Sequence, residues 1–572
     1  MYRFLAYAVC FSVTVFVLVN CSTSKKTTGY PSDNKTLTQG KELFNNNCAS
    51  CHAIADEGIG PRLGGITHLL SEKSLTDFIL NPAKVIDSGD LRAVNLSKKF
   101  KMVMPSFDFL KPAEINSILA YIHKETALNP IEPLVVKTET DAVSTTSERV
   151  GVPVKKSGIT IELEDFVQIP ASSDKPPLTR IANMRPHPTA DGSLFVSDQR
   201  GIIHHIHKGQ VSTFLDIRQK IDHYINAPGL GTGLGSFAFH PDYQKNGLIY
   251  ITHTEAFTGK KADYEFNDSI KVAMQWVVSA WKINDVKSAV FEGSRRELLR
   301  INVPSGVHGT QDINFIPGID KKDPDYGMLF IGTGDGGSTI GKHPELTHHL
   351  NSLLGTIIRI DPLGNNSPNG KYGIPSDNPF VNNPDPGTRK EIWAFGFRNP
   401  HRMSWDLNHG KIMFSAEVGE GNFEEVNVIV KGGDYGWNTR EGSYGISPSD
   451  LKTVFKVSDS EKYIRPYLEY DHLDGNAISG GSVYEGALTA LKDKYIFGDI
   501  VNGRIFFANI NRQLSDSTVY EIGIIQNGEP TNLQKMSGSK RVDLRVEYDY
   551  FTREMYMMTK SDGKIRRISK AR

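Results

Sequence analysis

The C-terminal part of the chain repeats one simple pattern, a short apolar strand followed by a polar turn. The segments that show it are SLFVSDQRGIIHHI, GLIYITHTE, GMLFIGTGDGG, KIMFSAEVGEG, KYIFGDIVNGRIFFANI and EMYMMTKSDGKIRRI. They recur at intervals of roughly 55 to 85 residues, bounded by Gly, Asp and Asn. A sheet unit repeated in this way is typical of a β-propeller with one unit per blade, so six segments predict about six blades. An array of β-sandwiches is the alternative.

One of these turns, GTGDGG at residues 332–337, resembles the glycine pattern of a dinucleotide-binding fingerprint. That fingerprint needs a helix directly after it, because the helix N-terminus meets the pyrophosphate. Pro344 interrupts the segment that follows. We therefore interpret GTGDGG as a turn at a strand end, with glycines at positive φ.

A second motif, Cys48-Ala-Ser-Cys51-His52, lies near the front of the chain. C-x-x-C-H is the attachment signature of a c-type haem, in which both thiols bond to the porphyrin and the His ligates the iron. A redox C-x-x-C does not require the His, and a zinc site needs two further ligands. His68 lies nearby, but the sequence has no second C-x-x-C. We therefore expect a covalent haem c, and MVMPSFDFL offers Met102 and Met104 as the second axial ligand.

Helical periodicity surrounds this motif. The stretches LTQGKELFNNNC, SEKSLTDFILNP and KPAEINSILAYIHKE predict three helices. Residues 37–128 resemble a class I cytochrome c, with GPRLGG after the haem motif and Met-Pro-x-Phe before the last helix. The resemblance implies a small all-α domain in which Met104 ligates the iron and Met102 packs. Residues 129–158, rich in Thr, Ser, Val and Pro, predict a flexible linker to a β domain at residues 159–572.

The first residues predict export. Arg3 precedes the apolar run FLAYAVCFSVTVFVLVN, which gives way at Cys21 to a polar segment, so residues 1–21 have the form of a signal peptide. Leu18-Val19-Asn20-Cys21 resembles a bacterial lipobox. This resemblance implies a lipid anchor on Cys21 and a periplasmic or cell-surface lipoprotein held at the membrane. An uncleaved membrane anchor is the alternative.

Longer strings in the β domain carry a family resemblance. They include FAFHPDYQKNGLIYI, LLGTIIRIDPLG, EIWAFGFRNPHRMSWD and EVGEGNFEEVNVIVKGGDYGW. These strings resemble the soluble PQQ-dependent glucose, aldose-sugar and sorbosone dehydrogenases, a family of six-bladed propellers that also includes the hedgehog-interacting proteins. The expected fold is therefore multidomain, a small all-α cytochrome c domain plus an all-β six-bladed β-propeller.

The resemblance also implies the residues of an active site. His308, in PSGVHGTQDINF, matches the general base that takes a proton from the sugar. A neutral imidazole suits this role because its pKa lies near the working pH. Arg398 and Asn399, in GFRNPHR, match the pair that contacts PQQ. Arginine is chemically apt there because PQQ carries carboxylates.

Two calcium ions follow from the same resemblance. The backbone carbonyls of Gly419 and Glu420, in EVGEGN, match the ligands of a calcium beneath PQQ. Glu425, together with the carbonyl of Tyr435 in GGDYGW, matches a second, structural calcium. Calcium prefers such hard oxygen ligands, and a cation beneath a quinone polarises it.

Other cofactor contacts of the glucose dehydrogenases are altered. Where the family has a Gln before the FAFHPD strand, this chain has Gly231 or Thr232. Val501 and Asn502 occupy the region that supplies a Lys, and the late Arg-x-Arg-Asp contact becomes residues 540–543, KRVD. The sequence is therefore more similar to the sorbosone-dehydrogenase-like branch.

Together these features predict an exported quinohaemoprotein oxidoreductase. It would oxidise a sugar or sugar-derived aldehyde at a PQQ/calcium site and pass electrons through haem c to a downstream respiratory acceptor, because reduced PQQ must release its electrons one at a time. The alternative is a cofactor-free ligand-binding propeller with an electron-transfer cytochrome c domain, which the altered Gln and Lys positions favour. With 65 basic and 65 acidic residues the formal net charge is zero, so nothing indicates a nucleic-acid partner.

Overall fold

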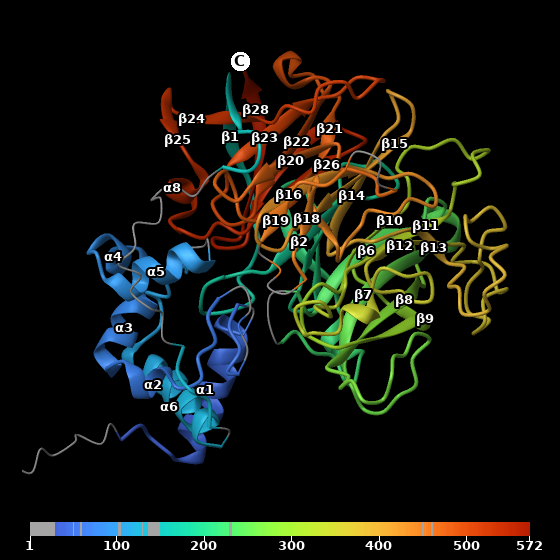
Figure 1. Ribbon diagram of the computed structural model, residues 1–572. Coiled ribbons are helices and arrows are strands. Elements are labelled where there is room, and N and C mark those ends of the chain that lie inside the picture. The colour runs from blue at the N-terminus through green and yellow to red at the C-terminus, as the bar shows by residue number, and fades with distance from the viewer. Residues whose placement is uncertain are drawn as a thin grey trace, which may run out of the picture.

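The computed structural model describes residues 29–49, 51–55, 57, 60–100, 104–128, 130–134, 149–227, 231–448, 451, 453–458 and 462–572. The predicted signal peptide with Cys21, and also Met102, lie outside the described residues. Within the described part of the chain, no helix has the length and apolar character needed to cross a membrane. Figure 1 shows the helices of the N-terminal part gathered beside a larger body of strands, which confirms the predicted fold class.

The N-terminal body is all-α. Its helices are α1 (Asn34–Asn47), α2 (Ile66–Leu69), α3 (Glu72–Leu80), α4 (Pro82–Asp87), α5 (Leu91–Phe100) and α6 (Pro112–Leu128). The three predicted helices correspond to α1, α3 and α6. The sequence did not predict α2 and α4, because helices of one or two turns are too short to show periodicity, and it also missed α5. Helices α1 and α6 pack closely at Gly40, where an added Cβ would lie 1.9 Å from the Ser117 carbonyl oxygen.

The C-terminal body is a propeller of six four-stranded antiparallel blades. Six inner strands surround its axis: β2 (Ile181–Pro186), β6 (Leu234–Phe239), β10 (Thr310–Asn314), β14 (Pro400–Asp406), β21 (Ile478–Tyr484) and β26 (Leu544–Asp549). Because each blade has four alternating strands, the chain returns to the same end before it starts the next blade. All six inner strands therefore begin at one end of the axis, which we call the N-terminal end, and finish at the C-terminal end.

The other three strands of each blade lie outward from the axis, while β17 (Arg440–Glu441), β18 (Tyr444–Ile446) and β19 (Val454–Phe455) form a small separate sheet and β25 (Glu529–Thr531) pairs with β24. The outward strands of the blades are β3 (Leu194–Asp198), β4 (Ile202–His207), β5 (Gln210–Asp216), β7 (Leu248–Ala256), β8 (Met274–Ile283), β9 (Gly293–Val303), β11 (Leu329–Thr333), β12 (Thr356–Ile360), β13 (Ile392–Phe395), β15 (Ile412–Glu417), β16 (Phe423–Val428), β20 (Leu468–Asp471), β22 (Lys494–Asp499), β23 (Ile505–Asn509), β24 (Tyr520–Gln526), β27 (Glu554–Thr559), β28 (Lys564–Ala571) and β1 (Lys155–Gln168). Apolar side chains such as Tyr250, Trp276 and Ile331 fill the spaces between blades.

The last blade is closed by the first strand of the domain. Strand β1 pairs antiparallel with β28, and it also runs parallel to β24 of the preceding blade. This strand begins at Lys155, inside the segment predicted as linker up to residue 158. The prediction ended the linker too late because a pairing between residues 155–156 and 520–521 is not visible in the local sequence. Strand β1 thus joins the two ends of the domain in one sheet and leaves no open edge between the fifth and sixth blades.

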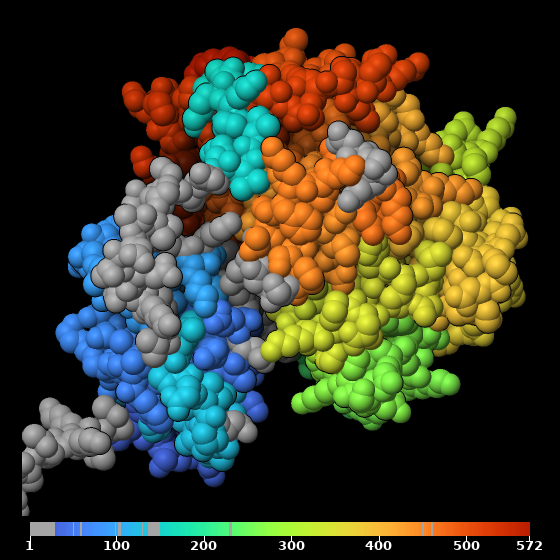
Figure 2. All heavy atoms as spheres, viewed as in Figure 1, coloured from blue at the N-terminus to red at the C-terminus, as the bar shows by residue number. Residues whose placement is uncertain are grey.

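The described ends of the predicted linker are anchored rather than free. Arg92 Nη1 donates to the Leu134 carbonyl at 2.8 Å, on the cytochrome side. On the propeller side, Arg149 forms ion pairs with Asp471 at 3.1 Å and with Asp474 at 2.6 Å. Figure 2 shows the two bodies lying against each other. The described residues at both ends of the predicted linker therefore have polar partners, and the flexibility of the join itself stays a prediction.

Candidate functional site

Two of the haem-attachment residues, Cys51 and His52, line an apolar cavity in the helical domain. Cys48 lies at the C-terminal cap of α1, and Cys51 and His52 follow in the next turn. Cys51, His52, Phe78, Phe100 and Met104 are among the residues around the cavity. The structure therefore brings His52 and the predicted ligand Met104 to one site.

The orientation of His52 suits an axial ligand. Its Nδ1 lies 2.7 Å from the Pro61 carbonyl oxygen, so Nδ1–H donates there and Nε2 carries the lone pair for iron. Gly60 allows the ring to lie close to the backbone, because a Cβ at this position would stand 2.5 Å from the imidazole. Burial lowers the pKa of His52 and raises the pKa of the Cys48 thiol to about 12. An apolar cavity with two reduced cysteines and a neutral imidazole fits a covalent haem.

His308 forms a buried pair with Asp335 at the N-terminal end of the propeller axis. His308 precedes β10, and its Nδ1 lies 2.8 Å from Asp335 Oδ1. Asp335 Oδ1 also accepts the Gly337 N–H at 2.8 Å, while Oδ2 accepts Trp437 Nε1–H at 3.1 Å. These three donors fix the carboxylate, and the carboxylate fixes the imidazole with Nδ1 protonated. His308 adopts φ 50°, a left-handed conformation unusual for a non-glycine residue, at a candidate site.

Burial and a nearby cation favour the neutral form of His308. Burial and the nearby Arg398 guanidinium lower the pKa of His308, although Asp335 opposes both effects. Burial works against ionisation of Asp335, but His308 and Arg398 outweigh it and lower the pKa of this carboxyl. A neutral imidazole with an oriented Nε2 lone pair is the form that accepts a proton.

Arg398 and Asn399 lie where the sequence predicts them, directly before β14. The Arg398 guanidinium donates through Nε and Nη2 to Glu420 Oε2, at 3.0 and 2.6 Å, and stacks over the Trp437 ring. The sequence assigned only the carbonyl of Glu420 a role; the structure adds an ion pair made by its carboxylate. His308, Arg398 and Glu420 are thus brought together in one charged group.

An enclosed cavity next to this group collects the predicted calcium residues. Gly419, Glu425 and Tyr435 line it, together with Glu417, Glu441 and the arginines Arg398 and Arg440. Glu420 is not among the lining residues, so the structure gathers three of the four predicted positions. Glu441 Oε1 accepts four consecutive backbone N–H groups, from residues 420 to 423, and so shapes the loop at one wall.

The donor chemistry of this cavity fits a hard cation. Burial and the neighbouring Glu425 raise the pKa of Glu417, and burial, followed by the charges of Glu469 and Glu441, raises the pKa of Glu425 to about 8. Among the described buried atoms, Glu417 Oε2 and Asn399 Oδ1 make no hydrogen bond. Buried carboxylates that repel one another, with unpartnered oxygens, are the kind of ligand set that calcium occupies. Sequence reasoning missed Glu417, which ends β15 without a recognisable motif.

A cluster of buried cations, which we call the axial cation cluster, lies at the same end of the axis. It consists of Arg180, Arg545 and Lys560. Burial and the neighbouring guanidinium groups lower the pKa of Lys560 far below its ordinary value, of Arg545 to about 9 and of Arg180 to about 10. Lys560 Nζ donates to Gln199 Oε1 at 2.5 Å.

This cluster fits an anionic ligand. Buried like charges are costly unless a counter-charge joins them, and Arg545 Nε and the nearby His401 Nδ1 are buried without a hydrogen-bond partner in the described structure. A polycarboxylate such as PQQ supplies the missing acceptors. The cluster provides a lysine although the family's usual lysine position holds Val501 and Asn502. Sequence reasoning missed Arg545 and Lys560, because charged residues next to strands are also common on surfaces.

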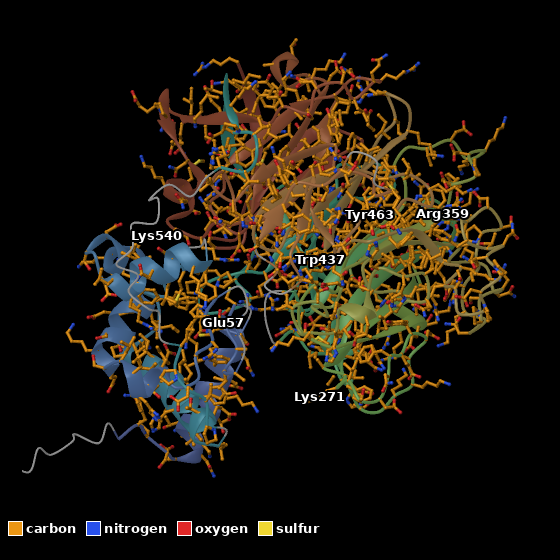
Figure 3. All side chains as sticks on the ribbon, in the orientation of Figure 1. Glu57, Lys271, Arg359, Trp437, Tyr463 and Lys540 are labelled. Carbon is orange, nitrogen blue, oxygen red and sulfur yellow. The ribbon has the colours of Figure 1, made fainter. Side chains whose placement is uncertain are left out.

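The haem motif faces this end of the propeller. Arg541, three residues before β26, pairs with Asp543 at 2.9 Å, and the charges of Asp543 and Cys51 help to raise its pKa. Arg541 also acts electrostatically on Arg545 of the axial cation cluster. Figure 3 shows the neighbouring Lys540 at the edge of the propeller that faces the helical domain. The candidate haem site and the candidate catalytic site are therefore on the same side of the propeller.

Comparison with known proteins gives the same two parts. The family description Glucose / Sorbosone dehydrogenase matches residues 183–527, and Cytochrome c matches residues 37–125. The HIPL2 protein of Arabidopsis thaliana is 30% identical over 343 residues, covering 52% of this chain and 47% of that protein. Quinoprotein glucose dehydrogenase B of Acinetobacter calcoaceticus is 30% identical over 219 residues, covering 36% and 39%. The chain spans about half the length of the Arabidopsis relatives it matches.

A solved structure shares the propeller fold. The soluble aldose sugar dehydrogenase of Escherichia coli, in its apo form, has a TM-score of 0.50 and 19% sequence identity, covering 71% of this chain and 98% of that one. The family match includes His308, Asp335, Arg398 and the enclosed carboxylate cavity. The chain belongs to the glucose/sorbosone dehydrogenase family and carries an N-terminal cytochrome c domain.

Proposed function

We propose that this protein is a PQQ-dependent sugar dehydrogenase of the aldose or sorbosone type that delivers its electrons to its own haem c. The observation that carries the proposal is the position of the His308–Asp335 pair. It lies at the same end of the propeller axis as a buried cluster of cations that fits a polycarboxylate cofactor, and this end faces the haem-attachment motif. The whole activity, including the sugar or sugar-derived aldehyde as substrate, belongs to this proposal.

The protein's own residues perform the proton chemistry. His308 Nε2 accepts the proton of the substrate hydroxyl, and Asp335 stabilises the imidazolium that forms, because its carboxylate already accepts Nδ1–H. PQQ, when bound, supplies a two-electron hydride acceptor. Arg398 and the axial cation cluster stabilise negative charge at that position. Calcium, held by Glu417, Glu425 and backbone carbonyls of the enclosed cavity, would supply electrostatic polarisation.

The haem domain completes the proposed reaction as the one-electron exit. Haem c, bound through Cys48, Cys51 and His52 with Met104 as second axial ligand, supplies one-electron transfer. The Lys175–Glu114 ion pair is a contact between the propeller and α6 of the helical domain. We further propose that the protein is exported and anchored through Cys21, and that a respiratory acceptor takes the electrons. Retention in the membrane fraction that is lost in Cys21→Ser would support this location.

One observation favours the alternative, a ligand-binding propeller without PQQ. The Arg398 guanidinium, expected to contact the cofactor, is already paired with Glu420. Purified protein should therefore be mixed with PQQ and calcium, exposed to a panel of aldoses and followed by the absorption bands of reduced haem. We expect haem reduction, lowered by about 10² or more in His308→Ala with PQQ binding kept. The alternative would stand if PQQ does not bind and no sugar reduces the haem.

A further inference from the structure

A second cavity, of about 390 Å³, lies at the C-terminal end of the propeller axis. Residues from the ends of the inner strands surround it, such as Pro186 of β2 and Asn314 of β10. His308 and Arg398 instead precede the strands β10 and β14. At roughly 3.3 Å per residue, the four residues from His308 to Asp312, and likewise from Arg398 to Arg402, separate the nearest lining positions from the candidate site by roughly 13 Å. This cavity is therefore distinct from the site of the proposed reaction.

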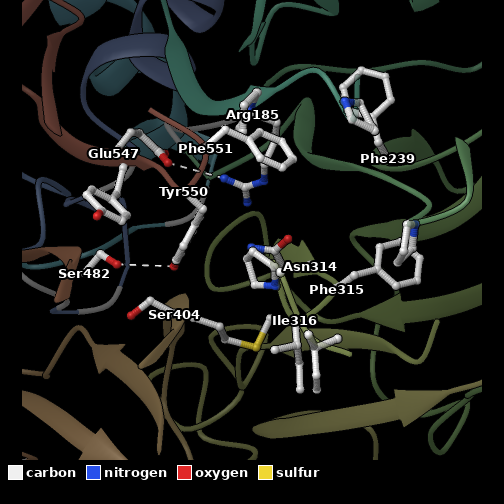
Figure 4. Close-up of a pocket in the computed structure, with 18 of the residues that line it drawn as sticks. Arg185, Phe239, Asn314, Phe315, Ile316, Ser404, Ser482, Glu547, Tyr550 and Phe551 are labelled. Atoms are coloured by element: carbon white, nitrogen blue, oxygen red, sulfur yellow. Dashed lines mark hydrogen bonds and ion pairs between the residues drawn. The ribbon is translucent and has the colours of Figure 1, made fainter. Parts of the chain in front are cut away.

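The walls of the cavity combine aromatic surface with hydroxyl groups. Figure 4 shows Phe239 and Phe315 on one side, and Ser482 and Glu547 on the other. The Tyr550 hydroxyl lies 3.2 Å from Ser482 Oγ. A cavity of this size falls in the range of roughly 300–1,000 Å³ that small-molecule sites occupy, and such sites have mostly apolar walls with a few polar groups.

The charges of the cavity balance. Arg185 pairs with Asp312 at 2.8 Å and with Glu547 at 3.3 Å, and Arg402 lies 3.8 Å from Glu547. Two guanidinium groups thus face two carboxyl groups, and Lys321, a further cation in the lining, pairs with Asp242 at 3.0 Å. A charged ligand would therefore find no unpaired opposite charge in this cavity. The axial cation cluster differs, because there an anion would meet an excess of positive charge. The balance favours a neutral ligand.

Polar atoms are nevertheless left for a ligand. Glu547 and Arg402 are only 7% and 6% exposed, but within the described structure Glu547 Oε1 and Arg402 Nε make no hydrogen bond, since 3.8 Å is too long for one. His240, 3% exposed, lines the same cavity with Nε2 unpartnered. Buried polar atoms without partners are rare in folded proteins. A purely apolar ligand would leave them unsatisfied.

We propose that this cavity binds one ring of a neutral saccharide. A pyranose has an apolar face, which packs on an aromatic ring, and an edge of hydroxyl groups, which donate to a carboxylate and accept from a guanidinium. The cavity offers both on opposite walls and carries no net charge. Bound there, a saccharide is held away from His308, so the site is non-catalytic. The inference does not depend on PQQ or on the proposed oxidation.

The test is calorimetric titration of the purified full-length haem protein with methyl glucoside and methyl cellobioside. These probes lack the free anomeric hydroxyl that the proposed reaction needs, and no PQQ is added. We expect binding that His308→Ala retains and that Phe551→Ala weakens about ten-fold or more. Phe551 lines the cavity and is 52% exposed, so its removal should not disturb the core. Phe455→Ala, at a residue 50% exposed that is not part of the cavity, is the matched control.

Tyr550→Phe provides a second variant, which removes one hydroxyl and leaves the ring. It should also weaken binding, while PQQ-supported haem reduction by free aldoses stays at the parent rate in both cavity variants. The proposal is overturned if neither probe binds up to ~10 mM. It is also overturned if His308→Ala abolishes binding while Phe551→Ala and Tyr550→Phe leave it intact, because the probe would then occupy the other end of the axis.

Discussion

Replacement of Asp335 by Asn is the sharpest test of the proposed base. The Asp335 carboxylate accepts from His308 Nδ1, the Gly337 N–H and Trp437 Nε1. Asparagine has the same shape but only one acceptor oxygen. If that oxygen faces His308 and Gly337, the new NH₂ group points at Trp437 Nε1–H, and two buried donors oppose each other. If it faces Trp437 instead, the NH₂ donates to His308 Nδ1 and moves the imidazole proton to Nε2, which can then no longer act as a base.

The magnitude follows from these contacts. Loss of a hydrogen bond to a charged group costs about 1.5–3 kcal/mol, which corresponds to about 10- to 150-fold in rate. A fixed wrong tautomer costs more, about 10⁴-fold in the Ser-His-Asp template. We therefore expect kcat/KM for sugar-driven haem reduction to fall by about 10² to 10⁴ in Asp335→Asn. PQQ binding and the haem spectrum should remain as in the parent protein.

The pH profile gives an independent readout. Asp335 opposes the lowering of the His308 pKa by burial and Arg398, so loss of the carboxylate charge should lower this pKa further. The base works when neutral, above its pKa, and the acidic limb of kcat/KM should therefore move to lower pH in the variant. Parent-like rates would refute the assignment of Asp335. An acidic limb that stays in place or moves upward would show that the limb reports another group.

Three further outcomes are expected. Chelation of calcium should reversibly lower the melting temperature, measured by calorimetry, by about 5 °C, because the buried carboxylates Glu417 and Glu425 lose their counter-ion. An unchanged melting temperature would argue against a cation at this site. Lys560→Met should weaken PQQ binding about ten-fold in a fluorescence titration. It should not lower the melting temperature of the PQQ-free protein, because it removes a desolvated charge. Unchanged affinity would show that Lys560 does not contact the cofactor. Arg541→Gln should lower the haem midpoint potential measured by spectroelectrochemistry, because a cation near Cys51 disfavours the oxidised haem. The control Lys271→Gln, at a distant and exposed residue, should leave the potential unchanged. If Arg541→Gln also has the parent potential, Arg541 has no electrostatic effect on the haem.

Features that depend on short contiguous stretches of sequence could be predicted. The haem motif is five residues long, and the strand-and-turn segments repeat the unit of each blade, so both the attachment site and the propeller followed directly. The resemblance located His308 and Arg398, which the structure brings together. The closure of the last blade by β1 could not be predicted, because the residues that pair lie hundreds of positions apart.

The missed residues share a physical reason. Asp335 lies in GTGDGG, which is indeed a strand-end turn with Gly336 and Gly337 at positive φ, and this structural role concealed the carboxylate that orients His308. Lys560 resembles a solvated turn residue in TKSDGK, and only the convergence of six blades buries it. Burial depends on neighbours from other blades, so local sequence carries little signal for it.

The arrangement of the inner strands explains why the candidate catalytic residues lie together at one end of the axis. Each inner strand begins at that end, so the residues just before β2, β10, β14 and β26 converge although the chain separates them widely. Arg180, His308, Arg398 and Asp543 occupy these positions. The Lys175–Glu114 ion pair connects α6 of the helical domain to the segment before β2, at the same end of the axis. A haem held in place, rather than one on a free tether, makes electron transfer depend on residues between the domains such as Arg541, and substitutions there should change the transfer rate without changing the affinity for sugar.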